Sequence, residues 1–155
     1  MLKDIEIYTD GSSLGNPGPG GWGVVIVSDT KTLVEVGGCE KKTTNNRMEL
    51  KAVIEALKQA IKKYPKDKVV IYVDSTYVLL GVTTWITNWE KNGWRTANKK
   101  DVLNKELWQE LIALVRNFKG TLSWQKVKGH NGHIHNERAD ALATQCSSLQ
   151  ENYVL

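Results

Sequence analysis

Four acidic residues lie where a carboxylate could take part in chemistry. Asp10 and Asp74 each come at the end of a β-rich run, and Glu49 and Asp140 each border the apolar stripe of a predicted helix. A carboxylate at the rim of an apolar face is costly unless it is paired or bound to a metal ion. The four positions are therefore candidates for a shared ionic or metal-binding site.

The first half of the chain predicts strands around one helix. Three β-rich runs on short links, at residues 5–10, 22–27 and 32–39, predict an antiparallel meander. Apolar residues at helical spacing then predict a helix from about Asn46, the expected N-cap, to Ile61. The continuous apolar run 69–73 predicts a strand buried on both faces, and strand–helix–strand implies a parallel crossover.

The second half adds helices and a last strand. A helical signal over residues 76–94 is broken by Gly81 and Gly93. The further elements are expected at 104–116 (helix), 122–127 (strand) and 136–146 (helix). This order predicts an α/β fold with a five-stranded mixed sheet flanked by helices. We expect one domain at residues 1–146 and a C-terminal tail at 147–155.

This arrangement would bring some of the carboxylates close together. If their strands are parallel neighbours, Asp10 and Asp74 meet at the same edge of the sheet, where ligand sites of such sheets tend to lie. Glu49 would lie about 40° around its helix from Val53, at the border of the buried stripe. Each residue also has a structural alternative: an Asx turn for Asp10, a helix cap for Asp74, a capping box for Glu49 and a solvated position for Asp140. Spacing alone does not show that the four converge.

Composition narrows the class of protein. The net charge is +4, from 21 Lys and Arg against 17 Asp and Glu, which weakly favours a polyanionic partner. Cys39 and Cys146 lack metal-site spacing and are expected to be two buried thiols in a reducing cytosol. No apolar run is long enough to span a membrane and no secretory signal is expected, so we predict a cytoplasmic protein.

An ordered set of motifs resembles bacterial-type (type I) ribonuclease H. The motifs are YTDGS at 8–12, GNPGPGG at 15–21, TNNRMEL at 44–50, DS at 74–75, YV at 77–78, the stretch 85–94, VKGH at 127–130 and NERAD at 136–140. The resemblance covers about residues 2 to 146, in order and at compatible spacing. It implies the ribonuclease H-like fold and an endonuclease that hydrolyses the RNA strand of RNA–DNA hybrids.

The resemblance also implies a catalytic site. Its metal ligands would be Asp10, Glu49, Asp74 and Asp140, holding two Mg²⁺ ions with the substrate, with Mn²⁺ as a substitute. Two ions would activate a water and stabilise the leaving oxygen, giving 5′-phosphate and 3′-hydroxyl ends. His130 is similar to the family's loop histidine, expected to assist proton transfer or product departure. An exposed loop histidine is the structural alternative.

The chain departs from the family pattern beside that loop. Ile134 and His135 stand where the family often has Pro-Glu, so that His130, His133 and His135 cluster in the sequence. The cluster could form a transition-metal site or alter the mobility of the catalytic loop.

Residues for substrate binding also follow from the resemblance. Asn16, Asn45 and Asn46 match positions that contact the 2′-hydroxyl, and Thr44 and Asn104 resemble a pocket for a phosphate of the DNA strand. Residues 85–100 correspond to the basic, aromatic segment that relatives call the handle. Its candidate contacts are Trp85, Lys91, Trp94, Arg95, Lys99 and Lys100. We favour packing for Trp89 and a groove-facing role for Trp85.

Two other functions remain open from the sequence. One is a hybrid-binding module without catalysis, which the presence of all four acids and His130 argues against. The other is a DNA nuclease or integrase of the same fold, which the asparagines and the handle argue against. We expect a monomer whose partner is an RNA–DNA hybrid.

Overall fold

The computed structural model describes residues 3–127, 133–150 and 153–154. Its strands form one sheet in the order β5-β4-β1-β2-β3-β6. Their bounds are β1 (Asp4–Ser13), β2 (Gly18–Ser28), β3 (Lys31–Thr43), β4 (Lys68–Val73), β5 (Thr121–Lys126) and β6 (Tyr153–Val154). β1, β2 and β3 are antiparallel, whereas β1–β4 and β4–β5 are parallel. The predicted five-stranded mixed sheet is confirmed, and the short β6 adds a sixth strand that pairs with β3.

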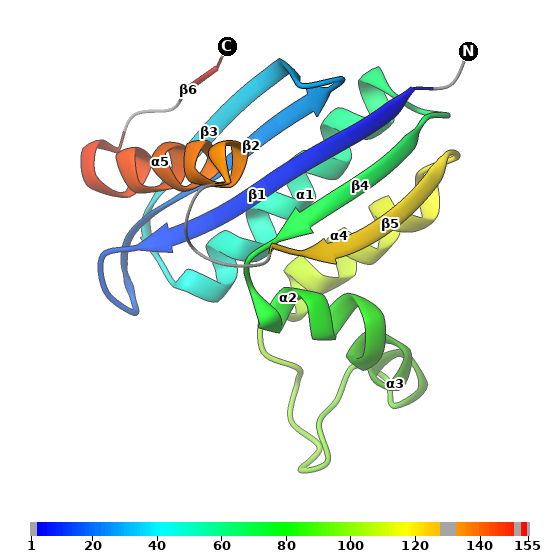
Figure 1. Ribbon diagram of the computed structural model, residues 1–155. Helices are drawn as coiled ribbons and strands as arrows, with labels where there is room; N and C mark the ends of the chain where they lie inside the picture. The colour runs from blue at the N-terminus through cyan, green and yellow to red at the C-terminus, as the bar shows by residue number, and fades with distance from the viewer. Residues whose placement is uncertain (1–2, 128–132, 151–152, 155) are drawn as a thin grey trace.

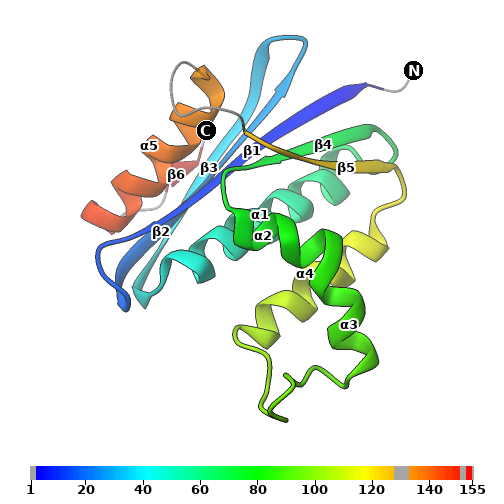
Figure 2. The ribbon, with the colours of Figure 1, turned by 60° about the horizontal axis from the view of Figure 1, so that its bottom comes forward.

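Helices cover the two faces of the sheet unequally. They are α1 (Asn45–Lys63), α2 (Thr76–Leu80), the π-helical turn η1 (Gly81–Trp85), α3 (Ile86–Lys91), α4 (Lys105–Asn117) and α5 (Ile134–Leu149). α1 and α4 pack behind the sheet, and α5 lies alone across β1, β2 and β3 on the other face (Figure 1). Figure 2 shows α2 and α3 running away from the sheet beside α4. No described helix is long and apolar enough to cross a membrane.

The uneven covering corrects one expectation about β4. Its residues alternate between buried and half-exposed, so that Val69, Ile71 and Val73 are buried but Val70 and Tyr72 are not. The strand was predicted to be buried on both faces because its run is continuously apolar. The reason for the difference is that α5 covers β1 to β3 and leaves that face of β4 without a helix.

The N-terminus of α1 differs from the prediction by two residues. Thr44, not Asn46, is the N-cap, and its hydroxyl accepts a hydrogen bond from the Arg47 N–H at 3.2 Å. A hydroxyl at the N-cap position is favourable because it accepts a hydrogen bond from a backbone N–H that has no partner within the helix. Glu49 therefore does not complete a capping box and is free to point elsewhere.

Gly81 does not break the helical segment after β4, as the sequence suggested. The chain continues from α2 through η1 to α3, and a Cβ at Gly81 would overlap the indole ring of Trp108. The glycine thus allows close packing against α4. Gly93, which has φ +67°, lies just after the end of α3. The last helix is also longer than expected, from Ile134 to Leu149.

The two cysteines form a disulfide, so the prediction of two free thiols was wrong. Cys39 lies on β3 and Cys146 on α5, 107 residues apart in the sequence. Their spacing carries no signal, because the pairing arises only when α5 packs across the sheet. The bond ties the helix that carries Asp140 to the sheet beneath it.

Reducing this disulfide should lower the free energy of unfolding by about 2–5 kcal/mol, since a bridge that closes a loop of this length restricts the unfolded chain strongly. Urea unfolding with and without a thiol reductant measures the loss. The Cys39→Ala/Cys146→Ala protein is the control, because its stability should not respond to reductant. An unchanged midpoint for the unmodified protein would show that the bond contributes nothing to stability.

Candidate active site

Two of the predicted carboxylates meet at one end of the sheet. β1 and β4 are parallel neighbours, with Thr9 opposite Val73, so the following residues Asp10 and Asp74 lie side by side at the carboxyl ends. Both line one small pocket. The predicted meeting of these two side chains is thus observed.

Glu49 reaches the same place from α1. Its Oε1 accepts a hydrogen bond from the backbone N–H of Gly11 at 3.0 Å. A Cβ at Gly11 would overlap the backbone of Met48 and Glu49, so glycine lets β1 and α1 approach here. The close approach places Glu49 next to Asp10 and leaves its second oxygen for another partner.

Asp140 completes the group from the opposite face of the sheet. It lies in the second turn of α5 and lines the pocket together with Asp10, Asp74, Asn136 and Glu137. A hydrogen bond joins its carboxyl to that of Asp10. The four carboxylates therefore come from β1, α1, the end of β4 and α5. These elements are separated in the sequence, and only the fold brings them together.

The electrostatics of the group are unfavourable without a cation. Burial raises the pKa of Asp10, which is only 7% exposed, and the charge of Glu49 and hydrogen bonds with Asp140 and Glu49 raise it further. Burial also raises the pKa of Glu49, although hydrogen bonds from Asp10 and Gly11 oppose this effect. The protonated form of Asp10 is thus favoured more than in an exposed carboxyl. Carboxyls with raised pKa values at a pocket are typical of a functional site.

The donor set fits an oxygen-preferring cation such as Mg²⁺. All four side chains offer hard carboxylate oxygens, and a bound divalent ion would relieve their mutual repulsion. In the described part of the chain, however, no three His, Cys, Asp or Glu side chains are arranged so that they could hold a metal ion by themselves. Mg²⁺ would take further ligands here from water and substrate phosphates, which it commonly does in proteins.

The three histidines are only partly placed. His130 lies outside the described residues, so its predicted role stays a prediction. The His133 Nε2 atom lies 3.3 Å from the Tyr8 hydroxyl, and the ring centroids of His133 and His135 are 6.0 Å apart. His133 is thus engaged with Tyr8, and the transition-metal hypothesis gains no support from the described residues.

Asn16 and Asn45 are brought together through Ser13. The Asn16 Oδ1 atom accepts hydrogen bonds from the Ser13 hydroxyl at 3.1 Å and from the Asn45 N–H at 3.0 Å. The Asn45 Oδ1 atom in turn accepts from the Ser13 N–H at 2.7 Å. Neither amide NH₂ group has a hydrogen-bond partner among the described residues, and Asn46 follows as an exposed neighbour.

The candidate phosphate pocket contains an arginine that the sequence analysis did not single out. Arg47 donates from Nη1 to the Asn104 Oδ1 atom at 3.1 Å and to Glu106 at 2.6 Å. Its backbone N–H is bound by Thr44, so Arg47 links the two predicted residues. Asn104 is buried and also donates to the Tyr77 hydroxyl at 3.2 Å. An arginine in the first turn of a helix, beside the cap, was the available sequence signal.

Aromatic packing holds the handle. The ring centroid of Trp89 lies 5.4 Å from Trp108, 5.8 Å from Trp85 and 5.9 Å from Trp94, which confirms packing for Trp89. Trp85 also makes an edge contact with Tyr77 at 5.7 Å. Trp85 and Trp94 stay half-exposed, so both could still touch a ligand.

The basic residues of the handle point to solvent. Lys91, Arg95, Lys99 and Lys100 are exposed, and none of them pairs with a carboxylate among the described residues. The one acid of the segment, Glu90, is bound to Arg116 at 2.6 Å. The handle therefore presents uncompensated positive charge.

The comparisons with known proteins identify the family of this chain. Residues 2–148 match the family model of RNase H. The chain belongs to the ribonuclease H family. It is 52% identical over 150 residues to the ribonuclease H of Thermosynechococcus vestitus, covering 97% of this chain and 92% of that protein. It is 55% identical over 142 residues to the ribonuclease H of a Polaromonas species, covering 91% and 86%. The predicted enzyme class is confirmed.

Solved ribonucleases H share the fold. LC9-RNase H1, described as a type 1 RNase H with the type 2 active-site motif, superposes with a TM-score of 0.86 at 33% identity, covering all of this chain and 78% of that one. LC11-RNase H1 in complex with an RNA/DNA hybrid superposes with a TM-score of 0.71 at 26% identity, covering 94% and 98%.

The raised pKa of Asp10 predicts that Asp10→Asn stabilises the metal-free enzyme, on the order of 2 kcal/mol near pH 8. A carboxyl whose pKa is raised by folding favours the folded state below its unfolded pKa and loses that contribution as pH rises. The gain from asparagine should therefore be absent near pH 4 and grow above it. Thermal unfolding in chelator from pH 4 to 8 measures it.

Asp4→Asn is the matched control, because Asp4 lies on the same strand but is exposed. It should leave the melting temperature unchanged. Added Mg²⁺ should shrink the advantage of Asp10→Asn by stabilising the unmodified enzyme alone. Equal melting curves for Asp10→Asn and the unmodified enzyme in chelator at pH 8 would contradict the repulsion described above.

Proposed function

We propose that this ribonuclease H cleaves the RNA strand of RNA–DNA hybrids through a site made by Asp10, Glu49, Asp74 and Asp140. The proposal is carried by the grouping of these acids: Asp10, Asp74 and Asp140 line one pocket, and Glu49 lies next to Asp10. Support comes from the ribonuclease H relatives and from LC11-RNase H1, which was solved with a hybrid.

The four acids would hold two Mg²⁺ ions together with the scissile phosphate. When bound, the ions supply an activated water and a positive charge for the leaving oxygen. The chain's own part is to keep the carboxylates in place: the Gly11 N–H orients Glu49, and Asp10 stands between Glu49 and Asp140. In-line attack on the phosphorus would leave 5′-phosphate and 3′-hydroxyl ends. His130 would move a proton at the water or the leaving group.

Selection for a hybrid would come from two surfaces beside the acids. Asn16, Asn45 and Asn46 offer amide donors for the 2′-hydroxyls of the RNA strand, which distinguish it from DNA. Thr44, Arg47 and Asn104 would bind a phosphate of the DNA strand, with the handle adding charge along the backbone.

We also propose a monomer that works in the cytoplasm with Mg²⁺, for which Mn²⁺ can substitute. Among the described residues, the large apolar side chains that are exposed include Leu14, Leu103 and Ile134, which belong to separate segments of the chain. Disulfides such as Cys39–Cys146 persist mainly where conditions are oxidising, and cytoplasmic reductants keep thiols reduced. A cytoplasmic enzyme would then work largely in the reduced form.

Asp10→Asn should abolish hybrid cleavage while the protein stays folded, since the amide keeps the shape but weakens cation binding. A labelled hybrid with Mg²⁺, Mn²⁺ or chelator measures this, beside duplex DNA and duplex RNA. Cleavage by the variant near the unmodified rate would refute the role of Asp10. Hybrid binding without cleavage by the unmodified protein would indicate a silent binding module, and cleavage of duplex DNA alone a DNA nuclease.

Removing the handle charges should weaken hybrid binding and flatten its dependence on salt, by roughly one unit of slope per lost phosphate contact. The variant carries Lys91→Ala, Arg95→Ala, Lys99→Asn and Lys100→Ala, with asparagine at 99 because the backbone there has φ +60°. Binding titrations with Asp10→Asn as background, at several salt concentrations, give the slope.

A matched control replaces four exposed lysines at the other end of α1 and beyond α4, namely Lys62, Lys63, Lys66 and Lys119, with alanine. It has the same change in net charge but should keep a steeper slope than the handle variant. Equal slopes for the two variants would show that the handle only adds to the overall charge.

A further inference from the structure

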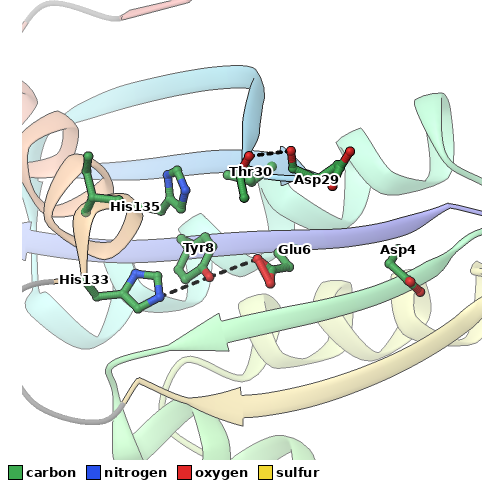
Figure 3. Close-up of a pocket in the computed structure, with 9 residues that line it drawn as sticks. Asp4, Glu6, Tyr8, Asp29, Thr30, His133 and His135 are labelled. Carbon is green, nitrogen blue, oxygen red and sulfur yellow. Dashed lines mark hydrogen bonds between the residues drawn. The ribbon is translucent and has the colours of Figure 1, made fainter.

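A hydrogen-bonded chain joins the start of α5 to β1 outside the carboxylate pocket. His133 is the residue just before α5, and its side chain does not cap the helix. The ring instead turns onto the sheet, with Nε2 3.3 Å from the Tyr8 hydroxyl, which lies 3.2 Å from the Glu6 Oε2 atom (Figure 3). Because the carboxylate can only accept, Tyr8 donates to Glu6 and accepts from the Nε2–H of His133.

The Tyr8 hydroxyl is well suited to this role. The side chain is 2% exposed, and its ring stacks on Tyr72 with centroids 4.6 Å apart and planes at 7°. A tyrosine hydroxyl keeps its proton at neutral pH, so it can donate to Glu6 and accept from His133 at the same time. The contact between His133 and Tyr8 is therefore a directed hydrogen bond held in one geometry.

The chain lies next to the catalytic contact between the same two elements. Asp10 follows Tyr8 by two residues, about 7 Å further on the same face of β1. Asp140 follows His133 by seven residues, about two turns or 10 Å along α5. β1 and α5 thus meet through polar side chains at Tyr8–His133 and at Asp10–Asp140, in addition to the apolar packing of Ala139 and Leu142 with Tyr8.

The two polar contacts differ in where they lie. The contact of Asp140 with Asp10 joins two carboxyls at the pocket, whereas the contact of His133 with Tyr8 lies outside it. Two other links hold the helix to β3: the ion pair of Arg138 with Glu35 at 2.9 Å and the Cys39–Cys146 disulfide. Of these anchors, the one through His133 is made to the strand that carries Asp10.

We propose that Tyr8 and His133 are positioning residues that hold α5 on β1 so that Asp140 meets Asp10 at the distance a shared cation requires. The proposal rests on the proposed function, because it assigns these residues to the cation site of that reaction. Neither side chain lines the carboxylate pocket, so they act through Asp140 rather than on the substrate.

Tyr8→Phe tests the hydrogen bond while keeping the ring. The Mg²⁺ concentration for half-maximal hybrid cleavage should rise about 3- to 10-fold, the range expected when one hydrogen bond that orients a metal ligand is lost. KM for the hybrid at saturating Mg²⁺ should not change. Tyr72→Phe is the matched control, because it removes a hydroxyl from the stacked partner ring, whose oxygen has no hydrogen bond among the described residues.

A pair of substitutions at His133 separates positioning from packing. His133→Gln can place an NH₂ donor near the position of Nε2 and should restore a Mg²⁺ midpoint close to that of the unmodified enzyme. His133→Asn is too short to reach Tyr8 and should resemble Tyr8→Phe. The Mg²⁺-dependent rise in melting temperature should shift by the same factor in each variant, which gives a readout independent of cleavage.

The outcomes are distinguishable. If the unmodified protein does not cleave hybrid, the proposed function fails, and the melting measurements still test the positioning. If it cleaves and Tyr8→Phe has the Mg²⁺ midpoint of Tyr72→Phe, the positioning proposal is overturned. A lower melting temperature for Tyr8→Phe with an unchanged Mg²⁺ midpoint would likewise overturn it, because the contact would then serve stability alone.

Discussion

Buried carboxylates that repel one another are the constraint on which the rest of this structure depends. Asp10 and Glu49 are held out of water beside Asp74 and Asp140, and burial and mutual charge raise the pKa values of the first two. Such a group costs free energy in the empty enzyme, and the cost falls when a divalent cation enters. The same arrangement that destabilises the metal-free fold therefore favours binding of the ion. Stability and activity oppose each other at this point of the molecule, as is common at functional sites.

Contacts between the surrounding elements keep the carboxylates close together despite their repulsion. β1 and β4 are joined by backbone hydrogen bonds, so Asp10 and Asp74 cannot separate. Because Gly11 has no side chain, α1 can approach β1 closely here. The Gly11 N–H also donates a hydrogen bond to Glu49. Among the described helices, α5 stands alone on its face of the sheet. It packs closely on Gly21 and Gly23 of β2 and has further links to β1 and β3. Asp140, which this helix carries, is exposed.

Much of the fold was predictable from the sequence because its signals are local. The alternation in β1, the apolar stripe of α1 and the apolar run of β4 each mark an element, and the strand–helix–strand order implies the parallel pair that brings Asp10 to Asp74. The disulfide, the link of Arg47 to Asn104 and the contact of His133 with Tyr8 were not predictable. Each joins residues far apart in sequence, and its formation depends on how a helix is placed on the sheet. The convergence of Glu49 and Asp140 on the pocket belongs to the same class, and only the ordered motifs pointed to it.

The residues proposed to bind the substrate and those proposed to hold the cation are joined through α1. Thr44 caps this helix, Arg47 extends from its first turn to Asn104, and Glu49 reaches the carboxylate group one half-turn further on. A phosphate bound near Thr44 and Arg47 would also gain from the positive end of the helix. Binding there would draw the Arg47 side chain toward the anion and away from Glu106, at the start of α4. α4 packs against α1, and its residue Trp108 packs against Trp89 of the handle. The proposed phosphate pocket and the handle are therefore connected through α4. The hybrid would therefore meet one connected surface whose far end is the carboxylate group.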